Sequence, residues 1–140
     1  HLVLFGNIRD RSLLDRLSVG YTYVGEVKGI EALVNIYTQA DIVLSTSRFE
    51  TLPGTLVEGM ACGCIPVAFD SGGQADIVDH LSTGYLAPAV EPEAMAEAMA
   101  WAAGATIDRK LLHDTAARKF DAPVIARQYI GLCERLLEKY

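Results

Sequence analysis

The sequence predicts an α/β fold with a doubly wound parallel sheet, and two observations support this prediction. Short apolar runs, each long enough for one buried strand, alternate with segments whose apolar residues recur at helical spacing. Strands joined through helices in this way run parallel. No repeat, low-complexity segment or linker interrupts the 140 residues. We therefore expect a single domain, residues 1–140, with five parallel strands and a helical carboxyl-terminal tail.

The first part of the chain shows strand, helix and strand in turn. Residues 1–6 are an apolar run that ends in glycine, as expected of a buried parallel strand. Residues 11–17 place three leucines at helical spacing after Asp10, a suitable helix cap. Residues 21–25 are rich in β-branched and aromatic side chains, which favours a second strand. Residues 30–37 carry an apolar stripe that predicts the next helix.

The remainder of the chain repeats this alternation and then becomes helical. Apolar residues 42–45 and 65–69 predict two strands with a helix between them. That helix is expected to begin at Pro53, because proline suits the first helical position. Residues 75–79 predict a short helix and residues 83–87 the last strand. Three further helices are expected over residues 91–103, 107–120 and 122–140.

The composition excludes several classes of function. A net charge of −6 and a pI near 4.9 argue against a broad surface for nucleic acid, so no nucleic-acid partner is expected. Three cysteines are present, and the spacing of Cys62 and Cys64 differs from that of common paired-thiolate zinc sites. We expect free thiols, which suit a reducing cytosol. No apolar run approaches the ~20 residues that cross a bilayer.

The stretch from residue 47 to residue 63 is the predicted site. Glu50 lies in the loop that follows a strand, where ligands of such sheets bind. Gly54 and Thr55 lie in a first helical turn whose free amides favour an anion such as phosphate. Glu58, one turn further, faces the same side. This polarity suits a diphosphate-linked sugar with a ribose, whose hydroxyls can donate to carboxylates. The alternative is that both glutamates are solvated surface residues.

One motif in this stretch is similar to the signature of a known family. Residues 47–67 are Ser-Arg-Phe-Glu-Thr-Leu-Pro-Gly-Thr-Leu-Val-Glu-Gly-Met-Ala-Cys-Gly-Cys-Ile-Pro-Val. They resemble the signature of the retaining GT-B glycosyltransferases of family 4, in which two glutamates, here Glu50 and Glu58, are separated by seven residues. The similarity continues at residues 23–25, 40–45, 71–73 and 83–86.

The resemblance implies roles for individual residues. Glu50 would be catalytic and accept hydrogen bonds from sugar hydroxyls near the reacting carbon, and Glu58 would accept them from the ribose. Val27 would pack on the base, although an exposed valine in an ordinary turn fits the sequence equally well. The other implied donor contacts are Leu52, Gly54, Thr55, Leu56, Gly72 and Gly73. The chain departs from the family's usual Gly, Ala and Glu at Pro53, Gly59 and Asp76.

The resemblance also implies a reaction and its partners. The complete enzyme would transfer a sugar from a nucleoside diphosphate donor to a saccharide or lipid-linked acceptor, with retention. An amino-terminal domain would bind the acceptor, so this chain is expected to be a fragment that is inactive alone. No metal or other cofactor is expected, because no Asp-x-Asp pair or His/Asp cluster is present to hold Mg²⁺. The expected location is cytoplasmic, at the inner face of the membrane for the complete enzyme.

The family's opening strand is also expected to be missing from this chain. That strand lies at the centre of the doubly wound order 3-2-1-4-5-6. Either the strands at residues 1–5 and 42–45 pair directly, or a segment outside this chain supplies the central strand. We favour the second arrangement, because shifting half of the sheet by ~4.8 Å would break the core packing on both faces.

Two other classes of function stay open. A sugar-nucleotide epimerase or a glycan phosphorylase has a similar architecture. A non-catalytic nucleotide-binding or interaction domain is the second alternative, although the pairing of Glu50 with Glu58 argues against a degenerate site.

Overall fold

The computed structural model describes residues 1–138, which form two compact units. Unit 1 comprises residues 1–36, and unit 2 begins at Tyr37. Within the described residues there are five strands, all in parallel pairs, with two strands in unit 1 and three in unit 2. The predicted α/β class and the parallel pairing are therefore confirmed.

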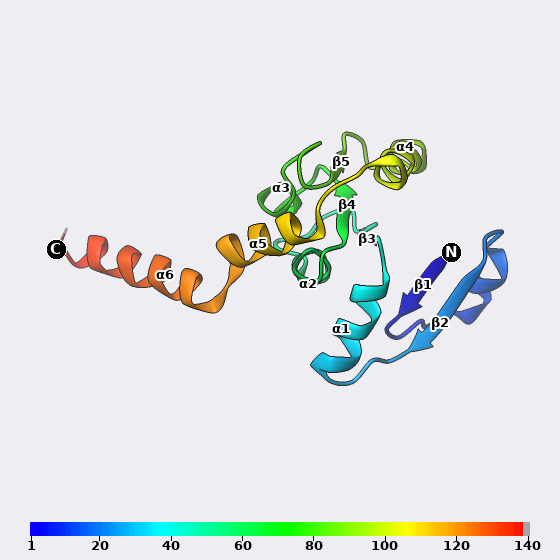
Figure 1. Cartoon of the computed structure of the whole chain (residues 1–140), viewed down its shortest axis with the longest axis horizontal. Helices are drawn as coiled ribbons and strands as arrows, with labels where there is room; N and C mark the ends of the chain where they lie inside the picture. Colours follow the sequence, from blue (N-terminus) through cyan, green and yellow to red (C-terminus); the bar gives the residue numbers. More distant parts are fainter. Residues whose placement is uncertain (139–140) are drawn as a thin grey trace. The chain divides into compact units, whose positions relative to one another are not determined.

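Unit 1 is built on a pair of strands. Strands β1 (Leu2–Phe5) and β2 (Tyr21–Gly25) lie side by side (Figure 1), with Val3 opposite Thr22 in the register. The segment between them forms a 3-10 helix, η1 (Arg11–Arg16), in place of the predicted α-helix. Its cap is as predicted, because the Asp10 side chain accepts a hydrogen bond from the amide of Ser12 at 3.0 Å.

The sheet of unit 2 has the order β3-β4-β5. Strand β4 (Ile65–Phe69) lies between β3 (Ile42–Leu44) and β5 (Tyr85–Ala87), and all five of its residues are buried. The continuous apolar run therefore marks the central strand, which is covered on both faces. Within each unit the strands pair in sequence order, β1 with β2 and β3 with β4 and β5 in turn, so both proposals for the place beside β1 and β3 stay predictions.

Six α-helices lie within the described residues. The predicted helix over residues 75–79 lies at residues 74–77, and the next-to-last helix begins two residues later than predicted because the Asp108 side chain caps it through the amide of Lys110. The predicted helix end at Tyr140 lies outside the described residues. The helices are α1 (Ile30–Gln39), α2 (Gly54–Ala61), α3 (Gln74–Ile77), α4 (Pro92–Gly104), α5 (Arg109–Phe120) and α6 (Ala122–Leu137).

The core of unit 2 lies where its helices pack on the sheet. Helix α2 packs against β3, β4 and α5, and α4 packs against β4 and β5. A Cβ on Gly59 of α2 would lie 2.6 Å from the Cβ of Val43 in β3, which accounts for glycine where the family usually has alanine. The largest fully buried apolar side chains of this core are Leu56, Met60, Ile77, Leu112, Val67 and Val78.

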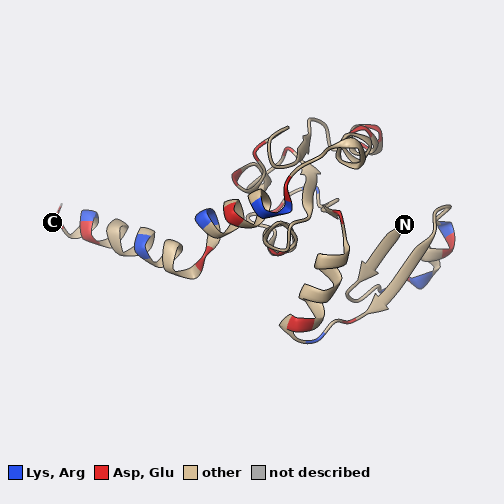
Figure 2. Ribbon diagram, viewed as in Figure 1, with Lys and Arg blue, Asp and Glu red and all other residues tan. Residues whose placement is uncertain are grey.

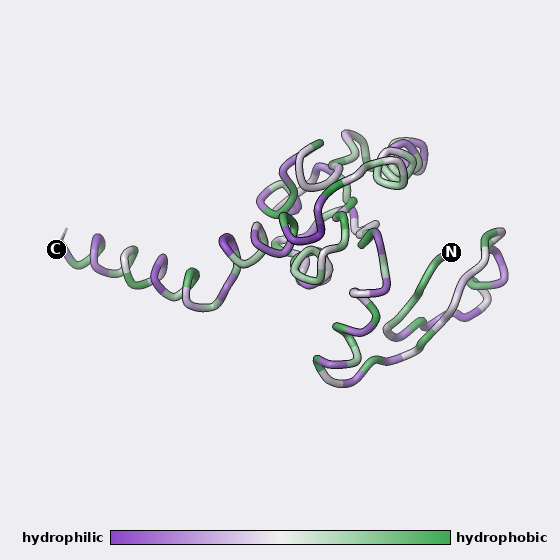
Figure 3. The backbone as a smooth tube through the Cα atoms, viewed as in Figure 1, coloured by the Kyte–Doolittle hydropathy of each residue, from purple (hydrophilic) through white to green (hydrophobic). Residues whose placement is uncertain are grey.

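The last helix differs from the other α-helices because none of its described residues is buried. Hydrophobic and hydrophilic segments alternate along α6 (Figure 3), as expected of an amphipathic helix. Lys and Arg are interspersed with Asp and Glu along α5 and α6 (Figure 2). No helix among the described residues has the length and apolar character needed to span a membrane.

Candidate functional site

The predicted site lies where the parallel strands of unit 2 end. The loop after β3 carries Glu50, which is half-buried, and leads into α2. The loop after β4 carries Gly72 and Gly73 and leads into α3. Both loops follow the carboxyl ends of neighbouring parallel strands, so they emerge from the same edge of the sheet.

Gly72 and Gly73 fix the backbone of the Glu50 loop. The amide of Gly73 donates a 2.8 Å hydrogen bond to the carbonyl of Glu50. A Cβ on Gly72, whose φ is +60°, would collide with the Glu50 carbonyl, and one on Gly73 would collide with the carbonyl of Thr51. These two glycines therefore allow a close backbone approach between two loops of the protein itself. Their contact with a donor stays a prediction.

Gln74 joins the same two loops and was not expected from the sequence. Its side chain is fully buried, and Nε2 donates to the carbonyls of Ser47, at 3.3 Å, and Ser71, at 3.1 Å. In the sequence, Gln74 is a polar residue that follows two glycines at the start of a short predicted helix. Ordinary polar turns have the same pattern, so the sequence alone did not indicate that the side chain is buried. Gln74 and the glycines together hold the loop that presents Glu50.

The start of α2 presents free backbone donors. Pro53 is the N-cap, so the helix begins one residue later than predicted. The Pro53 carbonyl accepts from the amides of Leu56, at 3.1 Å, and Val57, at 3.4 Å. The amides of Gly54 and Thr55 make no hydrogen bond within the described part of the chain. These two amides are therefore available to an anion at the positive end of the helix dipole.

The remaining predicted donor contacts differ in their exposure. Leu52 is 51% exposed, beside the helix start. Leu56 is fully buried and its amide is bonded to Pro53, so this residue packs in the core. Val27 is half-buried in unit 1, in the loop between β2 and α1, and its contact with a base stays a prediction.

Glu58 has a partner that the sequence did not indicate. The hydroxyl of Tyr37, near the end of α1, donates to Oε2 of Glu58 at 3.1 Å. Glu58 is exposed, whereas Tyr37 is only 3% exposed. Burial raises the pKa of Tyr37, and the neighbouring Glu58 carboxylate raises it further, so the hydroxyl keeps its proton and remains a donor. The only signal was a tyrosine on the predicted buried stripe, because a buried hydroxyl needs a partner.

The side chains of Cys64 and Arg109 make hydrogen bonds to the backbone near Tyr37 and Glu58. The Cys64 thiol, which is buried, donates to the carbonyl of Tyr37 at 3.0 Å. The Arg109 guanidinium binds three carbonyls at the ends of α1 and α2, those of Thr38 at 3.0 Å, Ala40 at 3.1 Å and Cys62 at 3.3 Å. The ends of the helices that carry Tyr37 and Glu58 are thereby tied together.

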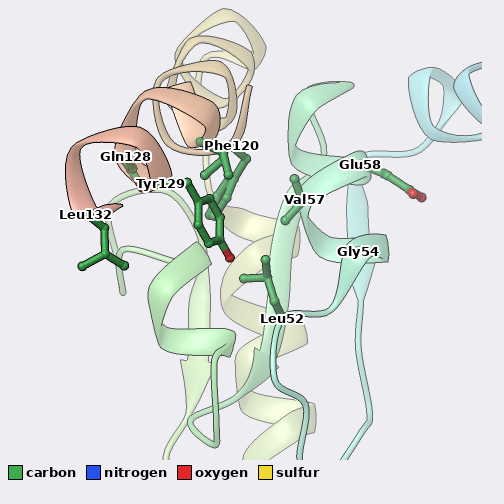
Figure 4. Close-up of a pocket in the computed structure, with 9 residues that line it drawn as sticks. Leu52, Gly54, Val57, Glu58, Phe120, Gln128, Tyr129 and Leu132 are labelled. Atoms are coloured by element: carbon green, nitrogen blue, oxygen red, sulfur yellow. The ribbon is translucent and has the colours of Figure 1, made fainter. Parts of the chain in front are cut away.

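An apolar cavity of about 620 Å³ adjoins the helix start. In Figure 4 the side chains of Leu52, Val57 and Tyr129 converge, whereas the carboxylate of Glu58 points away from them. The cavity is lined by Leu52, Gly54, Val57, Glu58, Phe120, Ile125, Gln128, Tyr129 and Leu132. Glu58 is therefore directed toward the side of α2 that Tyr37 occupies.

Comparison with known proteins agrees with the motif. The family model described as "Glycosyl transferases group 1" matches residues 2–119. A GDP-mannose-dependent alpha-mannosyltransferase of Mycolicibacterium smegmatis is 30% identical over 139 residues, which are 99% of this chain and 35% of that protein. The chain thus spans about a third of the length of the curated relatives that it matches over nearly all of its own length.

Solved structures share the fold. The sucrose-phosphate synthase of Thermosynechococcus elongatus is 26% identical, with a TM-score of 0.78, and the alignment covers 99% of this chain and 39% of that one. An Anabaena protein solved in complex with UDP-glucose is 20% identical, with a TM-score of 0.70 and coverage of 95% and 40%. Both alignments span nearly all of this chain and less than half of the solved protein.

Proposed function

The chain belongs to the group 1 glycosyl transferases, and from this membership we propose that it binds the nucleoside diphosphate sugar whose sugar the complete enzyme transfers to an acceptor. The observation that carries the proposal is the start of α2. There the unbonded amides of Gly54 and Thr55 and the carboxylate of Glu58 lie within two turns of one helix. An anion and a set of hydroxyls in one ligand match this arrangement.

The helix start would act on the leaving group. The donor diphosphate would bind the amides of Gly54 and Thr55 and the exposed Thr55 hydroxyl. When the bond between sugar and diphosphate breaks, negative charge grows on the diphosphate. Donors that are already fixed in place therefore stabilise the transition state more than the ground state.

The two glutamates would hold the two ends of the donor. Glu58 would accept hydrogen bonds from the ribose hydroxyls, and Glu50 from sugar hydroxyls near the reacting carbon. The bond from Gly73 to the Glu50 carbonyl supports the second role, because it fixes the backbone from which that carboxylate extends. We further propose that transfer retains configuration, and that a saccharide or lipid-linked acceptor binds to another part of the protein.

The test incubates the full-length protein with labelled donors, with and without saccharide and lipid-linked acceptors. GDP-mannose and UDP-glucose are the first donors to use, because the Mycolicibacterium relative is named for one and the Anabaena structure contains the other. Transfer of the label to an acceptor would support the proposal. Epimerisation of the donor without an acceptor, or nucleotide binding with no turnover of any donor, would favour the two other classes of function.

A further inference from the structure

Glu58 lies exposed on α2, but one of its oxygens is bound to a buried group. The Tyr37 hydroxyl donates to Oε2 across 21 residues of sequence, at 3.1 Å. The other oxygen, Oε1, lies over the first turn of the same helix, because a Cβ built on Gly54 would be 3.8 Å from it. Glu58 therefore directs one carboxylate oxygen toward Tyr37 and the other toward the helix start.

Tyr37 is well placed to fix this orientation. Its ring is buried, its carbonyl accepts from the Cys64 thiol, and Arg109 binds the carbonyl of the next residue, Thr38. An exposed glutamate otherwise samples several rotamers, and restricting them costs side-chain entropy. A hydroxyl held on a rigid support restricts the carboxylate before any ligand arrives.

We propose that Tyr37 is a positioning residue, whose hydroxyl occupies Oε2 of Glu58 and so presents Oε1 to the ribose of the donor. This inference rests on the proposed function, because it assigns Glu58 to the ribose. Preorganisation of this kind strengthens binding by removing an ordering cost that the ligand would otherwise meet. If Tyr37 only packs in the core, loss of its hydroxyl lowers stability and leaves nucleotide binding unchanged.

A double-mutant cycle separates these roles in the full-length protein. Tyr37→Phe, Glu58→Gln and the double variant are compared with wild type by calorimetric titration of GDP and UDP and by donor kinetics. Tyr23→Phe is the matched control, because its hydroxyl also donates to a protein oxygen, the Gly6 carbonyl at 2.8 Å, but contacts no carboxylate at the site.

Tyr37→Phe is expected to weaken nucleotide binding and raise the donor KM by about fivefold to tenfold, with kcat within about twofold of wild type. In the Glu58→Gln background the same change should have little further effect. Tyr23→Phe should leave the nucleotide Kd unchanged.

Two results would overturn the inference in distinguishable ways. If Glu58→Gln weakens binding but Tyr37→Phe does not, or if the two losses simply add, Tyr37 does not act through Glu58 and the proposed function stands. If Glu58→Gln itself leaves the Kd of both nucleotides at the wild-type value, the ribose assignment fails, and the positioning role fails with it.

Discussion

At the residue scale, Glu50 and Glu58 have different surroundings. Glu50 is half-buried in a loop that two glycines and Gln74 hold in place, whereas Glu58 is exposed on a helix and bonded to a tyrosine. The sequence predicted both residues from the motif alone. It could not predict Tyr37, because a tyrosine on an apolar helical stripe has the same pattern whether its hydroxyl meets water, a carbonyl or a carboxylate.

Glu50→Gln should slow transfer while leaving nucleotide binding intact. The substitution keeps the shape of the side chain but removes the charge that accepts from the sugar hydroxyls, and such bonds contribute ~1.5–3 kcal/mol. We expect kcat to fall at least tenfold with GDP or UDP Kd unchanged, measured by steady-state kinetics and calorimetry. Glu97→Gln, on the exposed face of α4, is the control. A wild-type kcat for Glu50→Gln would remove this residue from the site.

Cys64 should resist thiol reagents that modify Cys133. Burial raises the pKa of the Cys64 thiol to about 11, whereas Cys133 is exposed on α6. At pH 8 only about one Cys64 thiol in a thousand is then ionised, and the thiolate is the reactive form. Mass spectrometry after iodoacetamide treatment should find Cys133 labelled and Cys64 unlabelled. Equal labelling rates at pH 8 would contradict the buried environment of Cys64.

The same pKa predicts how stability depends on pH. The folded-state pKa of Cys64 lies above its ordinary value of 9.0, so the unfolded thiol loses its proton first as the pH rises. Its contribution to the free energy of unfolding is complete below about pH 9 and is lost toward pH 11. Urea unfolding of the wild type and Cys64→Ala across this range provides the measurement. The wild type should lose more stability than the variant.

At the element scale, the loop after β3 and the loop after β4 are joined by hydrogen bonds into one structure. The sequence predicted the strands, the helix between them and the glycine pair, because each has a local pattern. It could not predict that Gly72 and Gly73 serve a contact between loops, because that contact depends on the neighbouring carbonyls of Glu50 and Thr51. The observed start of α2 lies one residue after the predicted start. The sequence could not decide between them, because proline can serve either as the cap or as the first helical residue.

Gly73→Ala should therefore affect both stability and catalysis. The added Cβ collides with the Thr51 carbonyl, and overpacking of this kind costs ~1–3 kcal/mol. We expect a matching fall in the free energy of unfolding, measured in urea, together with a lower kcat because the Glu50 loop must shift. Gly104→Ala is the control, because the end of α4 has open space around that position. A fully stable and active Gly73→Ala would show that the loops are not closely packed.

At the scale of the whole molecule, local patterns predicted the α/β class and the five strands, whereas the order of the strands was predicted only from the family resemblance. The strands form one sheet of two and one of three, and strand order is a property of the fold that the periodicity of a single segment does not contain. Gly59 illustrates the same limit at a single position, since only the contact with Val43 explains it. The family signature predicts a site because it records a spatial arrangement that composition and periodicity do not contain.

Transfer by the full-length enzyme should not depend on a divalent metal ion. The charge that develops on the diphosphate would be stabilised by the helix amides and the Thr55 hydroxyl, and the sequence has no Asp-x-Asp pair for Mg²⁺. Activity measured in EDTA should equal the activity of the untreated enzyme. A loss of activity that added Mg²⁺ or Mn²⁺ restores would contradict this expectation.

The central claim is that the start of α2 binds the diphosphate and ribose of the donor. Calorimetric titration of the full-length protein with GDP and with UDP, in wild type, Glu58→Gln and Glu97→Gln, tests it most directly. We predict that at least one nucleotide binds the wild type and Glu97→Gln equally, and that Glu58→Gln weakens its Kd at least tenfold, or ~1.4 kcal/mol. An unchanged Kd in Glu58→Gln for every nucleotide that binds would contradict the claim.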